Sequence, residues 1–380
     1  MSSKNFLPFI IFILIIAMTS SCKKEASFLN SHASLAPDLQ VSSASSATRE
    51  TDNESDRELK VMTYNMNSGA EASGIWTSTS QAQLAVEVGK AFTNVQRTAP
   101  ERIEAIAHQI DIASPDIVGL QEAALWRVGA PLNPAPAETI AYDFLQILLD
   151  RLAAKGKHYS AISVQPHLDV ELTAVFGTTP PLDVRYTDRS IIIARTDLQT
   201  SRLQIEGVNA GAYVTNTVVS LLGMQFTLPK GWVSADIKYR GKTYRFVATH
   251  MGGTFEPVNF AQANELLQGP VNTTLPVILV GDFNSDAAAG SRSYSLLLNG
   301  GLADVWNSLR PDESGFPWPL SADNPLVILN PSKRLDLIWT RGAISLSGID
   351  MVGEDLADLT PSGFRPSNHA GLVATLVLKP

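Results

Sequence analysis

Polar residues that a protein core disfavours stand at the ends of several apolar segments of this sequence. They are Asn65, Glu122, Asp188, His250, Asp282 with Asn284, Asp336, and Asn368 with His369. Each one alone has an ordinary explanation, since an Asp after an apolar run is typical of a turn or helix cap. Because α/β enzymes place their chemistry at strand ends, the whole set indicates an active site.

The residue types in this set suit hydrolysis of a phosphodiester. That reaction needs neutralised phosphate oxygens, a water molecule that loses its proton, and stabilisation of the leaving alkoxide. A hard cation such as Mg²⁺ meets the first and third needs, and it prefers oxygen ligands such as Glu122 and Asn65. His250 and His369 suit phosphate binding or proton transfer, for which each needs a carboxylate on its second ring nitrogen.

Two aspartates, Asp188 and Asp336, are available as these histidine partners. Asp282 is then left to orient or deprotonate the water, and Asn284 to hold phosphate or water. The two lie two residues apart in "GDFNS", so their side chains share one side of an extended segment. We therefore predict that Asp282 and Asn284 act together.

The segments that carry these residues read as strands and helices of an α/β domain. Strands are predicted at 59–69, 116–123, 188–195, 244–251, 275–285, 334–342 and 369–378, and helices at 98–116, 141–156 and 260–270. Thr98 and Glu101 have the spacing of a capping box, which predicts a helix start at Thr98. Several strands follow one another through loops alone, so we expect stacked sheets with helices outside.

Seven motifs occur in a fixed order along residues 59–380: "TYNMN", "GLQEA", "YTDRSIIIAR", "ATHM", "VGDFNS", "RLDLIWT" and "SNHAGL". As an ordered set they resemble the endonuclease/exonuclease/phosphatase superfamily, of which deoxyribonuclease I is the type member. The resemblance implies an α/β four-layer sandwich, in which two stacked, mainly antiparallel mixed β-sheets are flanked by helices. It also implies phosphoester cleavage that depends on Mg²⁺, with Mn²⁺ as an alternative.

The resemblance further implies roles for individual residues. Asn65 and Glu122 would lie at the metal, and Asp282 and Asn284 would handle water and phosphate. His250 and His369 would be the active-site histidines, paired with Asp188 and Asp336. In the segment 186–189, Tyr186 and Arg189 would contact the substrate.

Asn368 is a departure, because the superfamily usually has Asp at this position. An Asn keeps one acceptor oxygen for a cation but loses the charge, and charged hydrogen bonds are about twice as strong as neutral ones. Two interpretations follow. Either the enzyme is active with weaker metal binding, which we favour because the rest of the set is present, or the chain is a surface binding protein on a catalytically impaired scaffold.

The N-terminus predicts export. An apolar run at 6–18 follows Lys4 and precedes "TSSC", and it is too short for an ordinary membrane span. Residues 1–21 therefore resemble a lipoprotein-type signal peptide with Cys22, the sole cysteine, as the lipidation site. Ordinary cleavage or an uncleaved anchor are the alternatives. We predict that residues 22–57 form a disordered tether. We predict that residues 58–380 form the catalytic domain.

These features place the protein in the bacterial envelope, at the outer membrane or cell surface, held by its lipid anchor. The net charge of −8 argues against a general nucleic-acid-binding coat, which would be basic, without excluding a local positive cleft. We predict a monomer that acts on extracellular nucleic acid. The alternative is a phospholipid headgroup, as in sphingomyelinases, or an inositol phosphate. The negative net charge of the chain and the apolar segment 218–232 favour this alternative.

Overall fold

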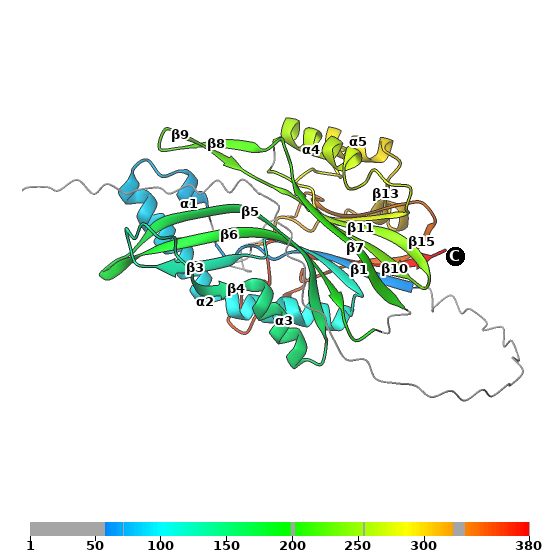
Figure 1. Cartoon of the computed structure of the whole chain (residues 1–380), viewed down its shortest axis with the longest axis horizontal. Helices are drawn as coiled ribbons and strands as arrows, with labels where there is room; N and C mark the ends of the chain where they lie inside the picture. The colour runs from blue at the N-terminus through cyan, green and yellow to red at the C-terminus, as the bar shows by residue number, and fades with distance from the viewer. Residues whose placement is uncertain (1–57, 71, 199–201, 254, 322–330, 380) are drawn as a thin grey trace, which may run out of the picture.

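The computed structural model describes residues 58–379 apart from residues 71, 199–201, 254 and 322–330. Two β-sheets are stacked between helices, with α2 and α3 on one side and α4 and α5 on the other (Figure 1). The predicted four-layer sandwich is confirmed. The predicted signal peptide, Cys22 and the tether lie outside the described residues.

The first sheet has eight strands, and most of its neighbours run antiparallel. Its order is β15 (Ile344–Val352), β16 (Gly371–Leu378), β1 (Glu58–Asn65), β2 (Ile117–Gln121), β6 (Thr179–Arg195), β3 (Leu125–Gly129) and β4 (Thr139–Asp143), and β5 (Tyr159–Phe176) also pairs with β6. The parallel pair is β1 with β2.

The second sheet has six strands, and a separate two-stranded ribbon lies apart from both sheets. The sheet order is β13 (Ala303–Asp304), β14 (Asp336–Arg341), β12 (Val277–Asp282), β11 (Lys242–His250), β10 (Gly231–Tyr239) and β7 (Leu203–Ala212). Strands β11 and β12 are parallel. The ribbon consists of β8 (Thr217–Leu221) and β9 (Met224–Leu228), in the apolar segment noted above.

The described helices complete the outer layers and the connections. They are α1 (Ser73–Trp76), α2 (Gln81–Ala113), α3 (Phe144–Ala154), α4 (Glu256–Gln268), α5 (Arg292–Asn299), α6 (Val305–Leu309) and the 3₁₀ helix η2 (Leu356–Asp358). None of the helices in the described part of the chain combines the length and apolar character needed to cross a membrane.

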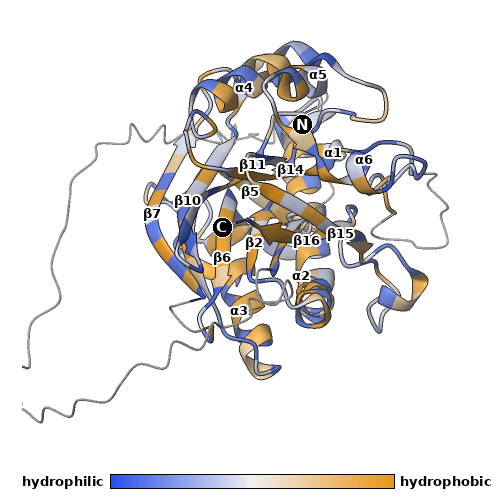
Figure 2. Ribbon diagram, turned by 90° about the vertical axis from the view of Figure 1, so that its right-hand side faces the viewer, coloured by the Kyte–Doolittle hydropathy of each residue, from blue (hydrophilic) through white to orange (hydrophobic). Residues whose placement is uncertain are grey.

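Alternating side chains along the strands build the layers. On β1, Leu59 and Val61 pack into the core between the sheets, while Met62 and Tyr64 pack on the other face among residues of α2 and α3. A strand that is buried on both faces reads as a continuous apolar run. In Figure 2 the central strands β2, β14 and β16 are mostly hydrophobic.

The sheets approach so closely at Gly119 of β2 that a side chain would not fit. A Cβ atom there would lie 2.7 Å from both the Cβ of Ala248 and a methyl group of Val280 on the opposite sheet. Substitution of Gly119 would therefore separate the sheets, whose strand ends carry the candidate site.

Helix α2 begins much earlier than the capping-box pattern predicted. Its N-cap is Ser80, whose side chain accepts a hydrogen bond from the Gln83 amide, and the hydroxyl of Thr98 donates to the carbonyl of Asn94 inside the helix. Pro100 lies within it. The predicted start at Thr98 is wrong because an apolar stripe continues upstream, through Leu84, Val88, Phe92 and Val95, all buried.

Candidate active site

Strand register aligns the catalytic candidates of the second sheet in one row. His250 on β11 lies opposite Asp282 on β12, which lies opposite Asp336 on β14. On the first sheet Asn65 pairs with the residue before Glu122. Because β1 and β2, like β11 and β12, are parallel pairs, their carboxyl ends meet at one end of the sandwich.

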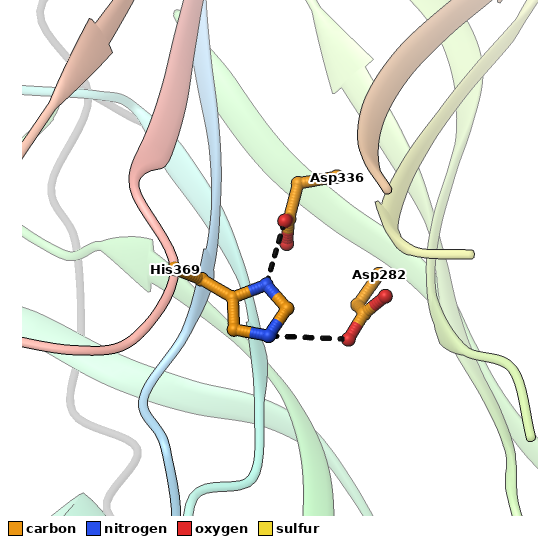
Figure 3. Close-up of side chains that lie close together, drawn as sticks. All are labelled: Asp282, Asp336 and His369. Carbon is orange, nitrogen blue, oxygen red and sulfur yellow. Dashed lines mark hydrogen bonds and ion pairs between the residues drawn. The ribbon is translucent and has the colours of Figure 1, made fainter. Parts of the chain in front are cut away.

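His369 lies just before β16 and is held between two aspartates (Figure 3). Its Nδ1 is 2.7 Å from Oδ2 of Asp336, which is the partner predicted for it, and its Nε2 is 4.0 Å from Oδ2 of Asp282. Burial alone would lower the pKa of His369. The charges of Asp336 and Asp282 and the hydrogen bond to Asp336 instead raise it to about 9, so His369 is protonated at neutral pH.

Asp282 is the centre of the arrangement. Its Oδ2 accepts a hydrogen bond from the Asn65 amide at 2.9 Å, and its Oδ1 accepts one from the Asn284 backbone at 2.9 Å. Burial, followed by the negative charge of Asp336, raises the pKa of Asp282 to about 6. A carboxyl group with this pKa can accept a proton near neutral pH.

Glu122 lies next to this group, in a sharp turn after β2. It has a φ of 51°, and its carboxylate accepts from the Asn65 side chain at 3.2 Å and from the Ser68 backbone at 3.0 Å. The Asn65 oxygen accepts the Asn67 amide at 2.9 Å. Asn65 therefore links the two acidic residues through its NH₂ group.

Arg189 supports this turn instead of facing the substrate. Its guanidinium donates to the carbonyls of Ala123 and Ala124 and to the Asp143 carboxylate, at 2.7, 3.1 and 2.6 Å. Since Arg189 is buried and engaged in these bonds, the predicted substrate contact is corrected to a structural role. It holds the chain that follows Glu122.

The donor set fits a hard divalent cation. Asp282, Asp336 and His369 form a buried group whose polar atoms lie within 4.8 Å of one another, and one Asp336 oxygen is buried without a hydrogen-bond partner. Because both ring nitrogens of a protonated histidine are donors, the ligands would be carboxylate oxygens. A cation would favour the ionised form of Asp282 that burial now disfavours. Glu122 and Asp282, which both accept hydrogen bonds from the Asn65 amide, are the residues that would hold it. The half-buried Asn368 lines one cavity with Glu122.

His250 has a different environment from the one we predicted. The Lys230 ammonium lies between it and Asp188, 3.1 Å from Nδ1 of His250 and 2.7 Å from Oδ2 of Asp188. The predicted direct pairing of His250 with Asp188 is therefore wrong. Because a lysine ammonium only donates hydrogen bonds, Nδ1 of His250 accepts, and its proton is on Nε2, 3.5 Å from Oδ2 of Asp282.

The electrostatics of this cluster follow from its burial and from Lys230. Burial and then the Lys230 charge hold the pKa of His250 well below its usual range. For Asp188, burial would raise the pKa, but Lys230 and the neighbouring histidines lower it. Lys230 was missed because it does not lie in a distinctive motif. The buried His167, whose burial lowers its pKa to about 4, likewise lies outside the motifs and was not assigned a role.

The remaining candidates lie around these groups. The Asn284 side chain donates to the Met251 carbonyl at 3.0 Å, and its backbone positions Asp282. Tyr186 packs against Trp126 with ring centroids 4.7 Å apart. Tyr186, Asp188, Glu122 and Asn368 all line one cavity of about 610 Å³, and the substrate contact of Tyr186 stays a prediction.

Comparisons with known proteins agree with this fold. The model of the endonuclease/exonuclease/phosphatase family matches residues 62–369. A family protein from Bacteroides thetaiotaomicron is similar in structure, with 18% identity and a TM-score of 0.50 over 85% of this chain and 98% of that one. The human nocturnin catalytic domain with bound sulfate has 19% identity and a TM-score of 0.51, covering 85% and 95%.

At such identities the structural similarities show the fold alone, whereas the family match spans most of the chain. No curated protein matches it significantly. With the family match added to the observed sandwich, the chain belongs to the endonuclease/exonuclease/phosphatase family, whose members are phosphoester hydrolases.

Proposed function

We propose that this protein is an exported, lipid-anchored phosphodiester hydrolase that depends on a divalent metal ion. The observation that carries the proposal is the buried group of Asp282, Asp336 and His369. It joins an acid of raised pKa to a histidine that is charged at neutral pH. A proton acceptor and a cationic donor side by side are what hydrolysis by water requires. The sulfate bound by the nocturnin domain is an anion of similar shape to phosphate.

The residues divide the reaction as follows. Asp282 accepts the proton of the attacking water, and its hydrogen bonds from Asn65 and Asn284 fix the position of its carboxyl group. His369 stabilises negative charge on the phosphate through Nε2, while Asp336 fixes the ring through Nδ1. The neutral His250 ring donates a hydrogen bond from Nε2 to the phosphate. The divalent cation, held by Glu122 and Asp282, would neutralise phosphate charge and stabilise the leaving oxygen.

The test is turnover of bis-p-nitrophenyl phosphate by the full-length chain, with Mg²⁺ or Mn²⁺ or with a chelator. We expect metal-dependent turnover that His369→Ala lowers at least about a hundredfold, the lower end for loss of an acid–base group. The exposed His108 provides the control, His108→Ala, which should match the parent. Turnover that survives both chelation and His369→Ala would refute the proposal.

Asn368 decides between this proposal and its alternative, a catalytically impaired binding protein. If the parent is active, Asn368→Asp should tighten metal binding, which a titration of activity against Mg²⁺ measures. An inactive parent with an active Asn368→Asp variant would instead support the binding protein, whose scaffold lacks one charge.

Nucleic acid remains our predicted substrate from the sequence, with phospholipid or inositol phosphate headgroups as the alternative. The salt dependence of affinity separates them. Several phosphate contacts make nucleic-acid binding fall steeply with salt, whereas a small headgroup makes few such contacts.

A further inference from the structure

The cavity of about 610 Å³ beside the candidate site is lined mostly by apolar side chains. Its walls come from α1, α2, β5, β6 and the β8–β9 ribbon. Figure 1 shows α1, the ribbon and the projecting ends of β5 and β6 on the same side of the molecule. Specific ligand sites have about 300–1,000 Å³ and are mostly apolar with a few placed polar groups, and this cavity has both properties.

The polar part of the lining is shared with the active site. Glu122, Asp188, Lys230 and Asn368 all contribute to the cavity wall. A phosphate in the candidate active site, beside Glu122, would therefore have the apolar space next to it. One substituent of the phosphate would then enter that space.

A loop closes the wall next to the catalytic histidine. The Leu320 amide donates to the Asn368 carbonyl at 2.9 Å, and the Trp318 ring lies 6.3 Å from the His369 ring. Trp318 and Leu320 both line the cavity. An apolar wall is thus attached by hydrogen bonding to the loop that carries Asn368 and His369.

The charges of the lining do not suit a polyanion. Its cations are Lys230, which is bonded to Asp188 at 2.7 Å, and Arg102, whose guanidinium lies 5.6 Å from the centre of the Phe364 ring. Glu122 and Asp188 balance them. Nucleic-acid binding takes most of its affinity from several cationic contacts with phosphates, and the described lining does not provide them.

We propose that the substrate is an amphiphilic phosphoester, whose phosphate occupies the candidate active site beside Glu122 and whose apolar substituent, an alkyl chain or an aromatic ring, fills this cavity. This inference rests on the proposed function and narrows its substrate class: an amphiphilic phosphoester replaces the nucleic acid that we predicted from the sequence. A lipid would supply an alkyl chain and an aryl ester a ring. In both cases the cavity removes the substituent from water.

The test compares methyl, hexyl and benzyl esters of p-nitrophenyl phosphate, which share one leaving group, below their micelle concentrations. Full burial of each CH₂ is worth about fourfold, so even partial burial should raise kcat/KM of the hexyl over the methyl ester at least about tenfold. The benzyl ester shows whether a ring or a chain is preferred. A ratio near one for both would overturn the proposal.

Two variants assign the preference to the cavity. Val170→Phe fills it from β5, and Phe226→Ala removes apolar surface from the ribbon; both residues line the cavity. Each should lower the hexyl-to-methyl ratio severalfold. The matched controls are Val164→Phe on β5 and Val218→Ala on β8. Val164 is 40% exposed and Val218 is 55% exposed, so both variants should keep the parent ratio. Circular dichroism melting checks folding, and an unchanged ratio in two folded cavity variants would overturn the assignment.

A binding measurement separates this inference from the proposed function. Methyl hexyl phosphate lacks the activated leaving group, and calorimetry should show that it binds with a negative heat-capacity change that Val170→Phe reduces. Binding without any ester turnover would refute the hydrolase and retain the cavity assignment. Ester turnover without a preference for the hexyl chain would retain the hydrolase and refute the cavity assignment.

Discussion

The two active-site histidines share their residue type, their burial and a common neighbour, yet their charges differ. His250 and His369 are 2% and 5% exposed, and their Nε2 atoms lie 3.5 and 4.0 Å from the same Asp282 oxygen. The pKa of His369 is raised to about 9, while that of His250 is held well below its usual range.

The partner at Nδ1 explains the difference. Burial disfavours the charged form of both rings. The Asp336 carboxylate at Nδ1, together with the charges of Asp282 and Glu122, outweighs burial for His369. The Lys230 ammonium at Nδ1 instead adds to the effect of burial for His250. One site thereby holds a cationic histidine and a neutral one on either side of Asp282. Each of the following substitutions removes one cause of this contrast.

Asp336→Asn should have the largest effect. Without its carboxylate His369 loses its charge at neutral pH, and turnover should fall about 10²–10⁴-fold, as for an acid–base group. Steady-state kinetics measure the loss. The exposed Asp350, with 69% of its side chain accessible, gives the control Asp350→Asn, which should retain the parent rate.

The same variant should change the pH dependence of stability in chelator. The pKa of His369 rises from 6.5 to about 9 on folding, so its stabilisation is present below pH 6.5 and is lost as pH rises through about 9. At ~1.4 kcal/mol per pKa unit this amounts to roughly 3 kcal/mol. Urea unfolding between pH 6 and 10 measures it, and an equal loss in Asp336→Asn would contradict our account.

Metal binding should have the second largest effect, through Asp282. Because folding raises the pKa of Asp282 from 3.8 to about 6, metal-free protein loses stability as pH rises from about 4 through 6. Mg²⁺ stabilises the ionised carboxylate, so it should raise Tm by several degrees at pH 7.5 and by less at pH 5.

Asp282→Asn should remove most of this Mg²⁺-dependent rise in Tm, as measured by scanning calorimetry. The exposed Asp312 provides Asp312→Asn as its matched control. A rise in Tm of the same size at both pH values, or one that Asp282→Asn leaves unchanged, would place the cation elsewhere.

Lys230→Met should have the smallest effect on turnover. It should have the clearest effect on the difference in pKa between His250 and His369. Loss of the ammonium leaves Asp188 free to pair with His250, so the pKa of His250 should rise and its Nδ1 should become protonated. We expect turnover to fall severalfold to about tenfold, within the range for one typical intramolecular hydrogen bond. Histidine ¹H–¹⁵N NMR spectra titrated with pH measure the shift.

The controls for Lys230 are one exposed lysine and one double variant. Lys238 on β10 is 41% exposed, and Lys238→Met should leave the His250 resonances in place. Lys230→Met with Asp188→Asn also removes the carboxylate, so the pKa of His250 should rise less than in the single variant. An unchanged pKa in Lys230→Met would show that burial alone keeps His250 neutral.

The sequence alone determined the layers and most members of the site. Apolar runs bounded by polar residues located strands such as β1, β12 and β16, because a strand buried on both faces leaves a continuous signal. Ordered motifs from Asn65 to His369 predicted the family and the pairing of His369 with Asp336. The start of α2 at Gln81 was not predicted, because the Thr98–Glu101 spacing of a helix cap can also occur inside a helix.

Only the tertiary structure decided the charge of each histidine and the shape of the cavity. Lys230 meets His250 and Asp188 because three separate segments converge there, and nothing in "LPKGW" indicates that meeting. Arg189 likewise supports the turn after Glu122 through carbonyl groups, which leave no trace in side-chain patterns. Protonation depends on which charges surround a buried ring, and these neighbours are fixed by packing between elements distant in the chain.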